Sequence, residues 1–229
     1  MEPLKLEVWS DIACPWCYVG KRRLEGALER FAPGAEIRWR SFELNPASPR
    51  EVDLSVSYAE RLASKYRVPK AQADLMIARM TETAAADGLP FRFDIIRPGN
   101  TFDAHRLIHL AKDRGLQGEM KESFLRAYLC EGERIGDPET LARIAKDVGL
   151  DDDDIQSVLG TDAYAKDVRA DEEEAGRIGI QGVPFFLVDR RFGVSGAQPV
   201  DTLLSVLERA ARERTPEIIE GAFCGPDGC

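Results

Sequence analysis

Hydrophobic and polar side chains alternate at residues 4–8, with the two-residue period of a β-strand. The period then changes to that of a helix, which ends before Pro33-Gly34. The apolar face of this helix is predicted to carry Leu24, Ala27, Leu28 and Phe31. Alternation returns at residues 37–42 and predicts a second strand. A strand, a helix and a second strand with a short return predict a βαβ unit with parallel strands.

A helical period dominates the middle of the chain, from about residue 56 to residue 179. Helix starts are indicated by Pro69, by Asn100 as an N-cap, by Asp137-Pro138, by the acidic run at residues 151–154 and by Thr161. The residues predicted to face the core on these helices are Leu75, Met76, Met80 and Ala84; Leu107, Ile108, Leu110 and Ala111; Met120, Phe124, Leu125, Tyr128 and Leu129; Leu141, Ile144, Ala145 and Val148; and Tyr164, Val168, Ala175 and Ile178. We interpret Met76 and Met80 as core rather than as the wall of a peptide-binding cleft.

A strand pattern returns at residues 182–188, and a turn at residues 189–191 leads to a partner strand. A last helix starts at about Pro199. Strands at both ends of the chain therefore bracket a helical block. We predict an α/β fold in which both ends build one sheet. Its parts are a discontinuous domain of residues 1–45 and 180–214, an inserted helical domain of residues 46–179, and a tail of residues 215–229.

Two cysteines, Cys14 and Cys17, stand where the first strand meets the first helix, separated by Pro15 and Trp16. Free backbone N–H groups and the positive end of the helix dipole stabilise an anion at such a place. We therefore expect the pKa of Cys14 to be lowered, which makes its thiolate a nucleophile near neutral pH. Cys17 lies one helical turn further on and can attack a mixed disulfide formed at Cys14.

Composition narrows the functions that this chain can have. It contains 229 residues, 44% of them hydrophobic, and carries a formal net charge of −9. The acidic balance argues against nucleic acid and against a membrane surface as partners. No apolar run approaches the roughly 18 residues of a membrane helix. The first residues form a predicted strand rather than a secretory signal, so we expect a cytoplasmic protein.

Three segments resemble the FrnE type of the DsbA-like disulfide oxidoreductases: residues 11–20 with Cys-Pro-Trp-Cys, residues 100–106, and Gly182-Val183-Pro184. The likeness runs from about residue 4 to residue 212. It implies a thioredoxin-like fold with a large helical insertion, in which Pro184 is cis and faces the dithiol. It also implies that the backbone of Val183 receives an extended substrate. We therefore expect Trp16, Val183 and Pro184 to contact the substrate.

Trp16 departs from DsbA itself, which resembles this chain but has histidine at that place. An imidazolium cannot then assist the Cys14 thiolate from within the motif. We expect a reduction potential less oxidising than the about −120 mV of DsbA.

Four other residues could bear on the chemistry, and three of them leave alternatives open. His105 lies in a segment that resembles the family, so it could approach the dithiol and tune Cys14, or it could face solvent or cap a helix. Cys224 and Cys229 have glycine and proline between them and can close a disulfide. The resemblance supports a second redox pair that exchanges with the first, and the alternative is a passive disulfide or a disordered end. Cys130 is predicted to be a buried, inert thiol.

We predict a protein disulfide oxidoreductase, with isomerase activity included, whose catalytic thiols are those of Cys14, Cys17, Cys224 and Cys229. It is expected to need no cofactor and no metal, and to exchange with protein or peptide thiols and a small thiol or thioredoxin-type reductant. One alternative is a glutathione-dependent isomerase or transferase of the 2-hydroxychromene-2-carboxylate or kappa-class type, which usually offers serine in place of Cys14. The other is a zinc-stabilised binding module that combines the two cysteine pairs.

Overall fold

A computed structural model of the chain describes residues 3–50 and 52–214. Its first elements are β1 (Leu4–Ser10), α1 (Pro15–Arg30) and β2 (Ala35–Ser41). The helices that follow are α2 (Tyr58–Tyr66), α3 (Lys70–Ala86), α4 (Phe102–Asp113), α5 (Gln117–Leu129), α6 (Pro138–Val148), α7 (Asp152–Gly160) and α8 (Ala165–Arg177). The described chain ends with β3 (Phe185–Val188), β4 (Phe192–Ser195) and α9 (Val200–Arg214).

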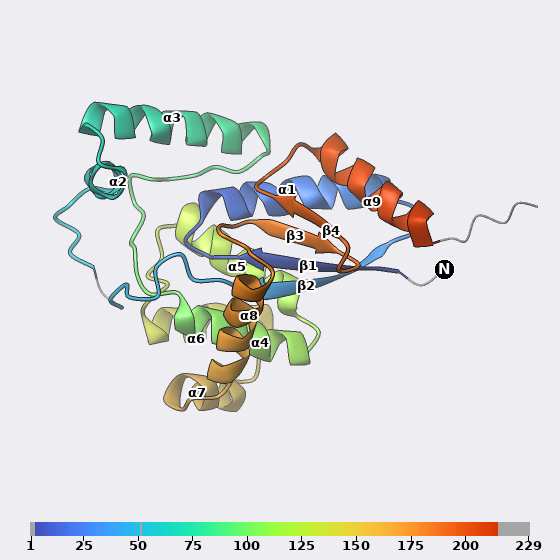
Figure 1. Ribbon diagram of the computed structural model, residues 1–229. Coiled ribbons are helices and arrows are strands. Elements are labelled where there is room, and N and C mark those ends of the chain that lie inside the picture. The colour runs from blue at the N-terminus through green and yellow to red at the C-terminus, as the bar shows by residue number, and fades with distance from the viewer. Residues whose placement is uncertain (1–2, 51, 215–229) are drawn as a thin grey trace, which may run out of the picture.

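The strands form one sheet in the order β2-β1-β3-β4 (Figure 1). β1 runs parallel to β2, with Leu6 opposite Ile37, and antiparallel to β3, with Val8 opposite Phe186. β3 and β4 form an antiparallel hairpin. The prediction that both ends of the chain build one sheet is confirmed, and so is the parallel βαβ unit at its start.

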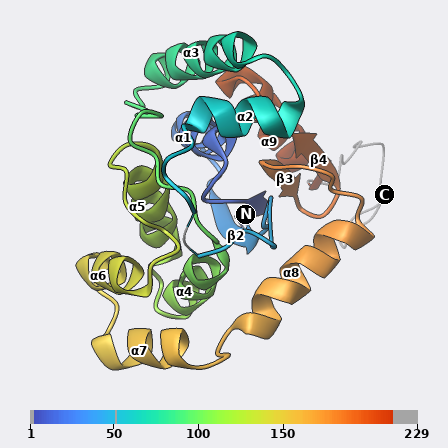
Figure 2. The same ribbon diagram turned by 90° about the vertical axis from the view of Figure 1, so that its left-hand side faces the viewer.

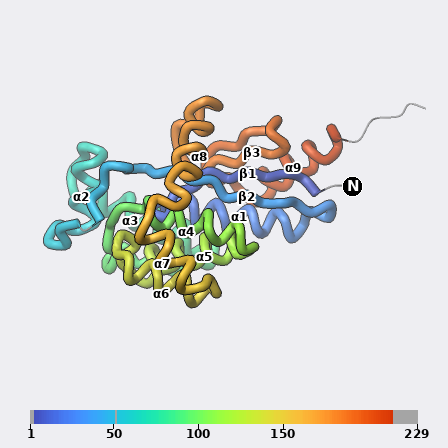
Figure 3. Tube along the Cα trace, turned by 90° about the horizontal axis from the view of Figure 1, so that it is seen from below, coloured from blue at the N-terminus to red at the C-terminus, as the bar shows by residue number. Residues whose placement is uncertain are grey.

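Side chains of β1 point alternately to two layers of helices. Val8 lies in the main hydrophobic core with Leu24 of α1 and Leu207 of α9. Trp9 points to the other side and packs against Ala175 of α8. Helices therefore cover both faces of the sheet at β1 (Figures 1 and 3), which explains why the strand is buried throughout most of its length. Among the described residues, no helix combines the length and the hydrophobicity needed to cross a bilayer.

Besides α8, which packs against Trp9, the helices between β2 and β3 fall into two groups. α4 to α7 pack beside the sheet, where α5 contacts both α1 and β2. α2 and α3 pack against each other and stand beyond the end of α1 that follows β1 (Figures 1 and 2). The second group therefore lies beside the Cys-Pro-Trp-Cys motif.

Two predicted helix starts are wrong by a few residues. α8 begins at Ala165 rather than at Thr161, because Tyr164 adopts a left-handed backbone conformation (φ 61°) that interrupts the helix. The N-cap of α4 is Thr101 rather than Asn100. The Asn100 side chain accepts a backbone N–H of the first turn at 2.9 Å, so it still supports the start of the helix.

Two residues predicted to face the core are exposed. Leu75 of α3 is 61% exposed and Ile178, which follows α8, is 40% exposed. α3 packs against α2 and α1 rather than across the sheet, so its outer side meets solvent. The helical period alone cannot show which part of an apolar stripe a neighbour covers.

Candidate active site

Cys14 is the N-cap of α1, between the end of β1 and the first helical turn. Its backbone is extended (φ −97°, ψ 111°), and Pro15 begins the helix, where the N–H that proline lacks would have no helical partner. The backbone N–H of Cys17 donates to the carbonyl oxygen of Cys14 at 3.0 Å. The motif therefore forms the first turn of α1 and holds both thiols at one end of the helix.

The two thiols differ in acidity. The Cys17 thiol donates a hydrogen bond that lowers the pKa of Cys14, although burial opposes this shift. Backbone N–H groups of Cys17 and Trp16 add to the lowering, as expected at a helix start. Burial is the main reason that the pKa of Cys17 lies well above its ordinary value of 9.0. Cys14 is therefore the thiol that ionises first, and Cys17 keeps its proton.

The loop before β3 faces Cys14. The Val183–Pro184 peptide bond is cis, as the resemblance implies, and the carbonyl oxygen of Val183 lies 3.5 Å from the Sγ atom of Cys14. A Cβ atom at Gly20 would meet Cγ of Pro184 at 2.8 Å, so glycine is what lets the loop approach α1 this closely. The structure thus brings Val183 and Pro184 next to the first cysteine of the motif.

A buried lysine lies behind the dithiol. Lys121 of α5 is 1% exposed, and its Nζ atom donates to the carbonyl oxygen of Ser10 at 3.1 Å. Burial lowers the pKa of Lys121 to about 8, against the opposing effect of Cys17. The sequence analysis missed this residue, yet a signal was present: Lys121, Leu125 and Tyr128 fall on one face of the helix, so the lysine stands within an apolar stripe.

Asp11 and His105 form a second buried pair near the motif. The Nε2 atom of His105 lies 3.3 Å from Oδ1 of Asp11, and the backbone N–H of Leu44 donates to Oδ2 at 2.8 Å. Burial raises the pKa of Asp11, but these hydrogen bonds outweigh it and the pKa is lowered. Burial lowers the pKa of His105, so its imidazole is neutral at neutral pH. The solvent-facing and capping alternatives for His105 are wrong, and its hydrogen-bond partner is Asp11 rather than Cys14.

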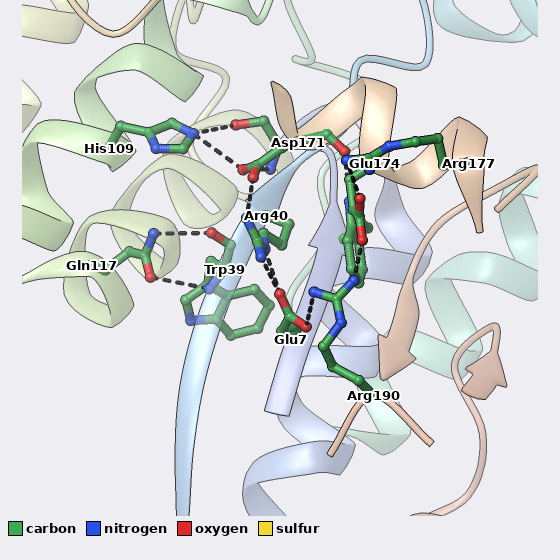
Figure 4. Close-up of polar contacts among 11 residues, drawn as sticks. Glu7, Trp39, Arg40, His109, Gln117, Asp171, Glu174, Arg177 and Arg190 are labelled. Atoms are coloured by element: carbon green, nitrogen blue, oxygen red, sulfur yellow. Dashed lines mark hydrogen bonds and ion pairs between the residues drawn. The ribbon is translucent and has the colours of Figure 1, made fainter. Parts of the chain in front are cut away.

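A separate polar network holds α8 against the sheet (Figure 4). Asp171 of α8 accepts hydrogen bonds from Arg40 at 2.6 Å and from the backbone N–H of Ser41 at 2.9 Å. Its other neighbour is His109, whose Nε2 atom lies 3.2 Å away. Arg40 also pairs with Glu7 of β1. Because α8 leads into the loop that faces Cys14, this network fixes the helix from which that loop starts.

A groove of about 460 Å³ adjoins the motif, with Pro15 and Trp16 on one side and residues of α2 and α3 on the other. Trp16 is 45% exposed there. Met80 is buried in the main hydrophobic core, as predicted, whereas Met76 is half-buried, and both side chains line the groove. α3 covers α2 and α1 rather than the sheet, which leaves this side of its apolar stripe open.

The other predicted cysteines lie away from this arrangement or outside it. Cys130 follows α5 as its C-cap and is half-buried rather than buried, and burial raises its pKa to about 11. Cys224 and Cys229 lie outside the described residues. Within residues 3–50 and 52–214, no group of three or more histidine, cysteine, aspartate or glutamate side chains is arranged to hold a metal ion.

Comparison with known proteins gives a consistent family assignment. The model of the family described as DSBA-like thioredoxin domain matches residues 5–208. The chain is similar to the crystal structure of a probable DsbA oxidoreductase from Streptomyces coelicolor, with 43% identity, coverage of 99% of this chain and 98% of that one, and a TM-score of 0.87. Among curated proteins it is similar to the uncharacterized protein YwbO of Bacillus subtilis, with 29% identity over 80% of this chain and 86% of that protein. A 2-hydroxychromene-2-carboxylate isomerase shares the fold, with 16% identity over 92% of this chain and 97% of that chain and a TM-score of 0.67.

Proposed function

The chain belongs to the family of DSBA-like thioredoxin domains, and we propose that it is a thiol–disulfide oxidoreductase that exchanges disulfides with protein substrates through Cys14 and Cys17. The observation that carries this proposal is the placement of two free thiols in the first turn of α1, with Cys14 at the N-cap, 3.5 Å from the carbonyl oxygen of Val183. This placement lowers the pKa of Cys14 and raises that of Cys17. The FrnE type, isomerase activity and a cytoplasmic location are further parts of the proposal.

Cys14 starts the reaction. Its thiolate attacks one sulfur of a substrate disulfide, the substrate S–S bond breaks, and the leaving substrate sulfur takes up a proton. A mixed disulfide between Cys14 and the substrate remains. Trp16, Val183 and Pro184 border the position that this substrate sulfur occupies, and we assign substrate contact to them.

Cys17 completes the reaction. It loses its proton, its thiolate attacks the Cys14 sulfur, and the bond between Cys14 and the substrate breaks. The second substrate sulfur leaves and takes up a proton, so the substrate gains two electrons and the protein keeps a Cys14–Cys17 disulfide. The nearby Lys121 ammonium lowers the pKa of Cys17 against the effect of burial, which favours this step. A small thiol or a thioredoxin-type reductant restores the dithiol, and the reverse sequence oxidises a substrate dithiol.

A trapping experiment tests this function. Cys17→Ser should accumulate a mixed disulfide with a protein substrate such as insulin, because the resolving thiol is absent. Cys130→Ser is the matched control, since it removes a thiol that the scheme does not use. A folded Cys17→Ser protein that traps no partner, or wild-type protein that does not reduce insulin, contradicts the proposal.

Cys224 and Cys229 enter the proposal as a second redox pair that exchanges with the first. The support for this role is the spacing of the two cysteines in a tail with glycine and proline between them. Replacing both by serine should slow turnover with an external reductant while leaving the single-turnover reaction of Cys14 and Cys17 intact. Unchanged turnover of the double variant removes the exchange role.

Direct measurements can distinguish disulfide exchange from the two alternative functions, a glutathione-dependent isomerase or transferase and a zinc-stabilised binding module. The isomerase likeness is one of fold, and the complete dithiol at Cys14 and Cys17 favours disulfide exchange over glutathione-dependent isomerisation. Parallel assays of insulin reduction and glutathione conjugation distinguish the two reactions. Metal analysis together with thiol counting on unreduced protein tests the zinc-stabilised binding module.

A further inference from the structure

We propose that a second cavity, next to the groove that adjoins the motif, binds a phosphate monoester with an aromatic body. The aromatic body of this ligand packs against Tyr58 and Phe93, and its phosphate group binds Arg61 and Arg97, all of which line the cavity. The site takes no part in the proposed disulfide exchange, and ligand binding can be measured without that reaction.

The cavity has a volume of about 580 Å³ and lies among α2, α3 and residues 93–98. It shares Tyr58, Ile77 and Phe93 with the groove, so these side chains form a wall between the two spaces. Of the described residues that line it, none belongs to the Cys-Pro-Trp-Cys motif or to the loop that contains Pro184. A cavity of this size suits a small organic molecule, and it is separate from the surface that faces Cys14.

Aromatic and aliphatic side chains form one part of the lining. Phe93 and Ile96 are each 8% exposed and belong to the main hydrophobic core, so the protein holds them in place. The Tyr58 ring packs on Phe93 with 5.0 Å between the ring centroids, and both rings line the cavity. Leu54 and Val56 line the same space but remain 51% and 39% exposed. An aromatic ligand body therefore removes apolar protein surface from water, which favours binding.

Arg61 of α2 brings an unused hydrogen-bond donor to the cavity. Its Nη2 atom is buried and has no hydrogen-bond partner in the described chain. Asp53 lies within electrostatic range of this guanidinium, but its carboxylate accepts the backbone N–H of Ser55 at 2.8 Å and forms no ion pair with Arg61 among the described residues. A buried guanidinium N–H without an acceptor is unfavourable, and a phosphate oxygen satisfies it with a charge-assisted hydrogen bond.

Arg97 lines this cavity and also a smaller one of about 70 Å³, which Arg50 and Arg134 line as well. Two glycines allow the segments that carry these arginines to approach each other. A Cβ atom at Gly136 would overlap the carbonyl oxygen of Arg50, and one at Gly99 would lie 3.0 Å from the same oxygen. The fold therefore gathers cationic side chains from segments that are distant in the sequence.

The two cavities together have a positively charged lining. It contains five cationic side chains and two carboxylates, in a chain whose net charge is −9. Both carboxylates have other partners, because Asp94 accepts a hydrogen bond from Arg92 at 2.8 Å and Asp137 is the N-cap of α6. Two of the cations, Lys70 and Arg50, also form ion pairs. The other three form no ion pair within the part of the chain that the structure describes, so an anion finds unpaired positive charge here. A phosphate monoester carries up to two negative charges at neutral pH and suits these guanidinium groups better than a single carboxylate does.

Calorimetric titration of the reduced full-length protein with naphthyl phosphate, at constant ionic strength, tests this site. Naphthyl phosphate should bind about tenfold or more tightly than naphthol, which lacks the anion, and than inorganic phosphate, which lacks the aromatic body. Arg61→Gln and Arg97→Gln should each weaken binding about tenfold, as expected for the loss of a charge-assisted hydrogen bond. Arg79→Gln is the matched control, because Arg79 lines the groove but not this cavity, and it should keep the wild-type affinity.

Alkylation of Cys14 with iodoacetamide before the titration checks that the site is separate from the dithiol, and binding of naphthyl phosphate should persist. Loss of binding after alkylation, or an affinity that Arg79→Gln lowers as much as Arg61→Gln and Arg97→Gln do, places the ligand in the groove and overturns the proposal. Equal affinities for naphthyl phosphate and inorganic phosphate overturn the aromatic part of the site. Wild-type affinity in both Arg61→Gln and Arg97→Gln overturns the phosphate contacts.

Discussion

Lys121 on α5 reaches the carboxyl end of β1, where its Nζ atom donates a hydrogen bond of 3.1 Å to the carbonyl oxygen of Ser10. The two residues are 111 positions apart in the chain, and the fold joins the helical insertion to the strand that leads into Cys14. The ammonium group is thereby held in the interior near Cys17 and Asp11, where the charge of the Asp11 carboxylate, and that of the Cys17 thiolate once it forms, favours its protonated form. An inserted helix thus supplies a cation to the dithiol.

Replacing this lysine should change the redox chemistry. In Lys121→Met the thiolates lose a nearby positive charge, so the pKa of Cys17 should rise and resolution of the mixed disulfide should slow by about tenfold or more. The dithiol form is stabilised less, so the reduction potential should become more negative by about 30 mV or more. Equilibration with glutathione measures the potential, and quenched-flow alkylation measures resolution.

The matched control for this prediction is Lys112→Met, which removes the same charge from an exposed position on α4. Methionine is apolar and close in length to the lysine side chain, so it fills the same buried space and the Lys121→Met protein should fold. A Lys121→Met variant whose potential and resolution rate equal those of Lys112→Met shows that the buried cation plays no part in catalysis.

The hydrogen bond from Cys17 should set the acidity of Cys14. Cys17→Ala removes the donor and should raise the pKa of Cys14, whereas Cys17→Ser keeps a hydroxyl donor and should raise it less. The pH dependence of iodoacetamide labelling at Cys14, followed by mass spectrometry of its peptide, measures both shifts. Identical labelling profiles for the two variants would mean that the helix start alone lowers the pKa of Cys14.

The sequence predicts the sheet and the position of the dithiol because both depend on local patterns. Alternation at residues 4–8 and proline at the first helical position each fix an element without reference to the rest of the chain. The same is true of Asp137, whose side chain accepts the backbone N–H of Thr140 as an N-cap should. These features gave the correct strand, the correct helix start and the correct junction.

The surroundings of the dithiol depend on contacts between distant segments, which local patterns do not contain. Lys121 could be recognised as unusual from its apolar stripe, but its approach to Ser10 follows from the packing of α5 against α1 and β2. The role of Met76 depends on how α3 stands beyond the start of α1, and no periodicity encodes that placement. His105 was placed near the site by resemblance, and the structure adds that Asp11 is its partner.

Asp171 should be a main support of the fold (Figure 4). Asp171→Asn removes the charge that Arg40 and His109 share, so it leaves a buried guanidinium short of a partner and should lower the free energy of unfolding by about 3–5 kcal/mol. Asp167→Asn, an exposed change at the start of the same helix, should cost no more than about 1 kcal/mol. Urea unfolding curves of the two variants compare these values, and similar curves contradict the prediction.

The Asp171 carboxylate should also make the free energy of unfolding depend on pH. Burial raises the pKa of Asp171, but hydrogen bonds from His109, Ser41 and Arg40 outweigh it, so the folded-state pKa is lowered. A carboxylate with a lowered pKa stabilises the fold above its unfolded-state value of about 3.9, and that contribution is lost as the pH falls through the lower folded-state value. Acid unfolding of Asp171→Asn should therefore show a weaker dependence on pH below about pH 4 than that of Asp167→Asn. Equal slopes would assign the acid sensitivity to other groups.

Trp16 should keep the protein a weaker oxidant than DsbA. An indole carries no charge that could stabilise the Cys14 thiolate, so we expect a potential more negative than the about −120 mV of DsbA. Trp16→His introduces a cation near that sulfur when it is protonated and should make the potential less negative, more so below the ordinary histidine pKa of about 6.5. Because Trp16 is 45% exposed, water screens the new charge, and a shift of about 30 mV is a reasonable expectation. Trp16→Gln, which is polar but neutral, is the control. Equal reduction potentials of Trp16→His and Trp16→Gln at pH 6 contradict the electrostatic explanation. A wild-type reduction potential at or above that of DsbA contradicts it as well.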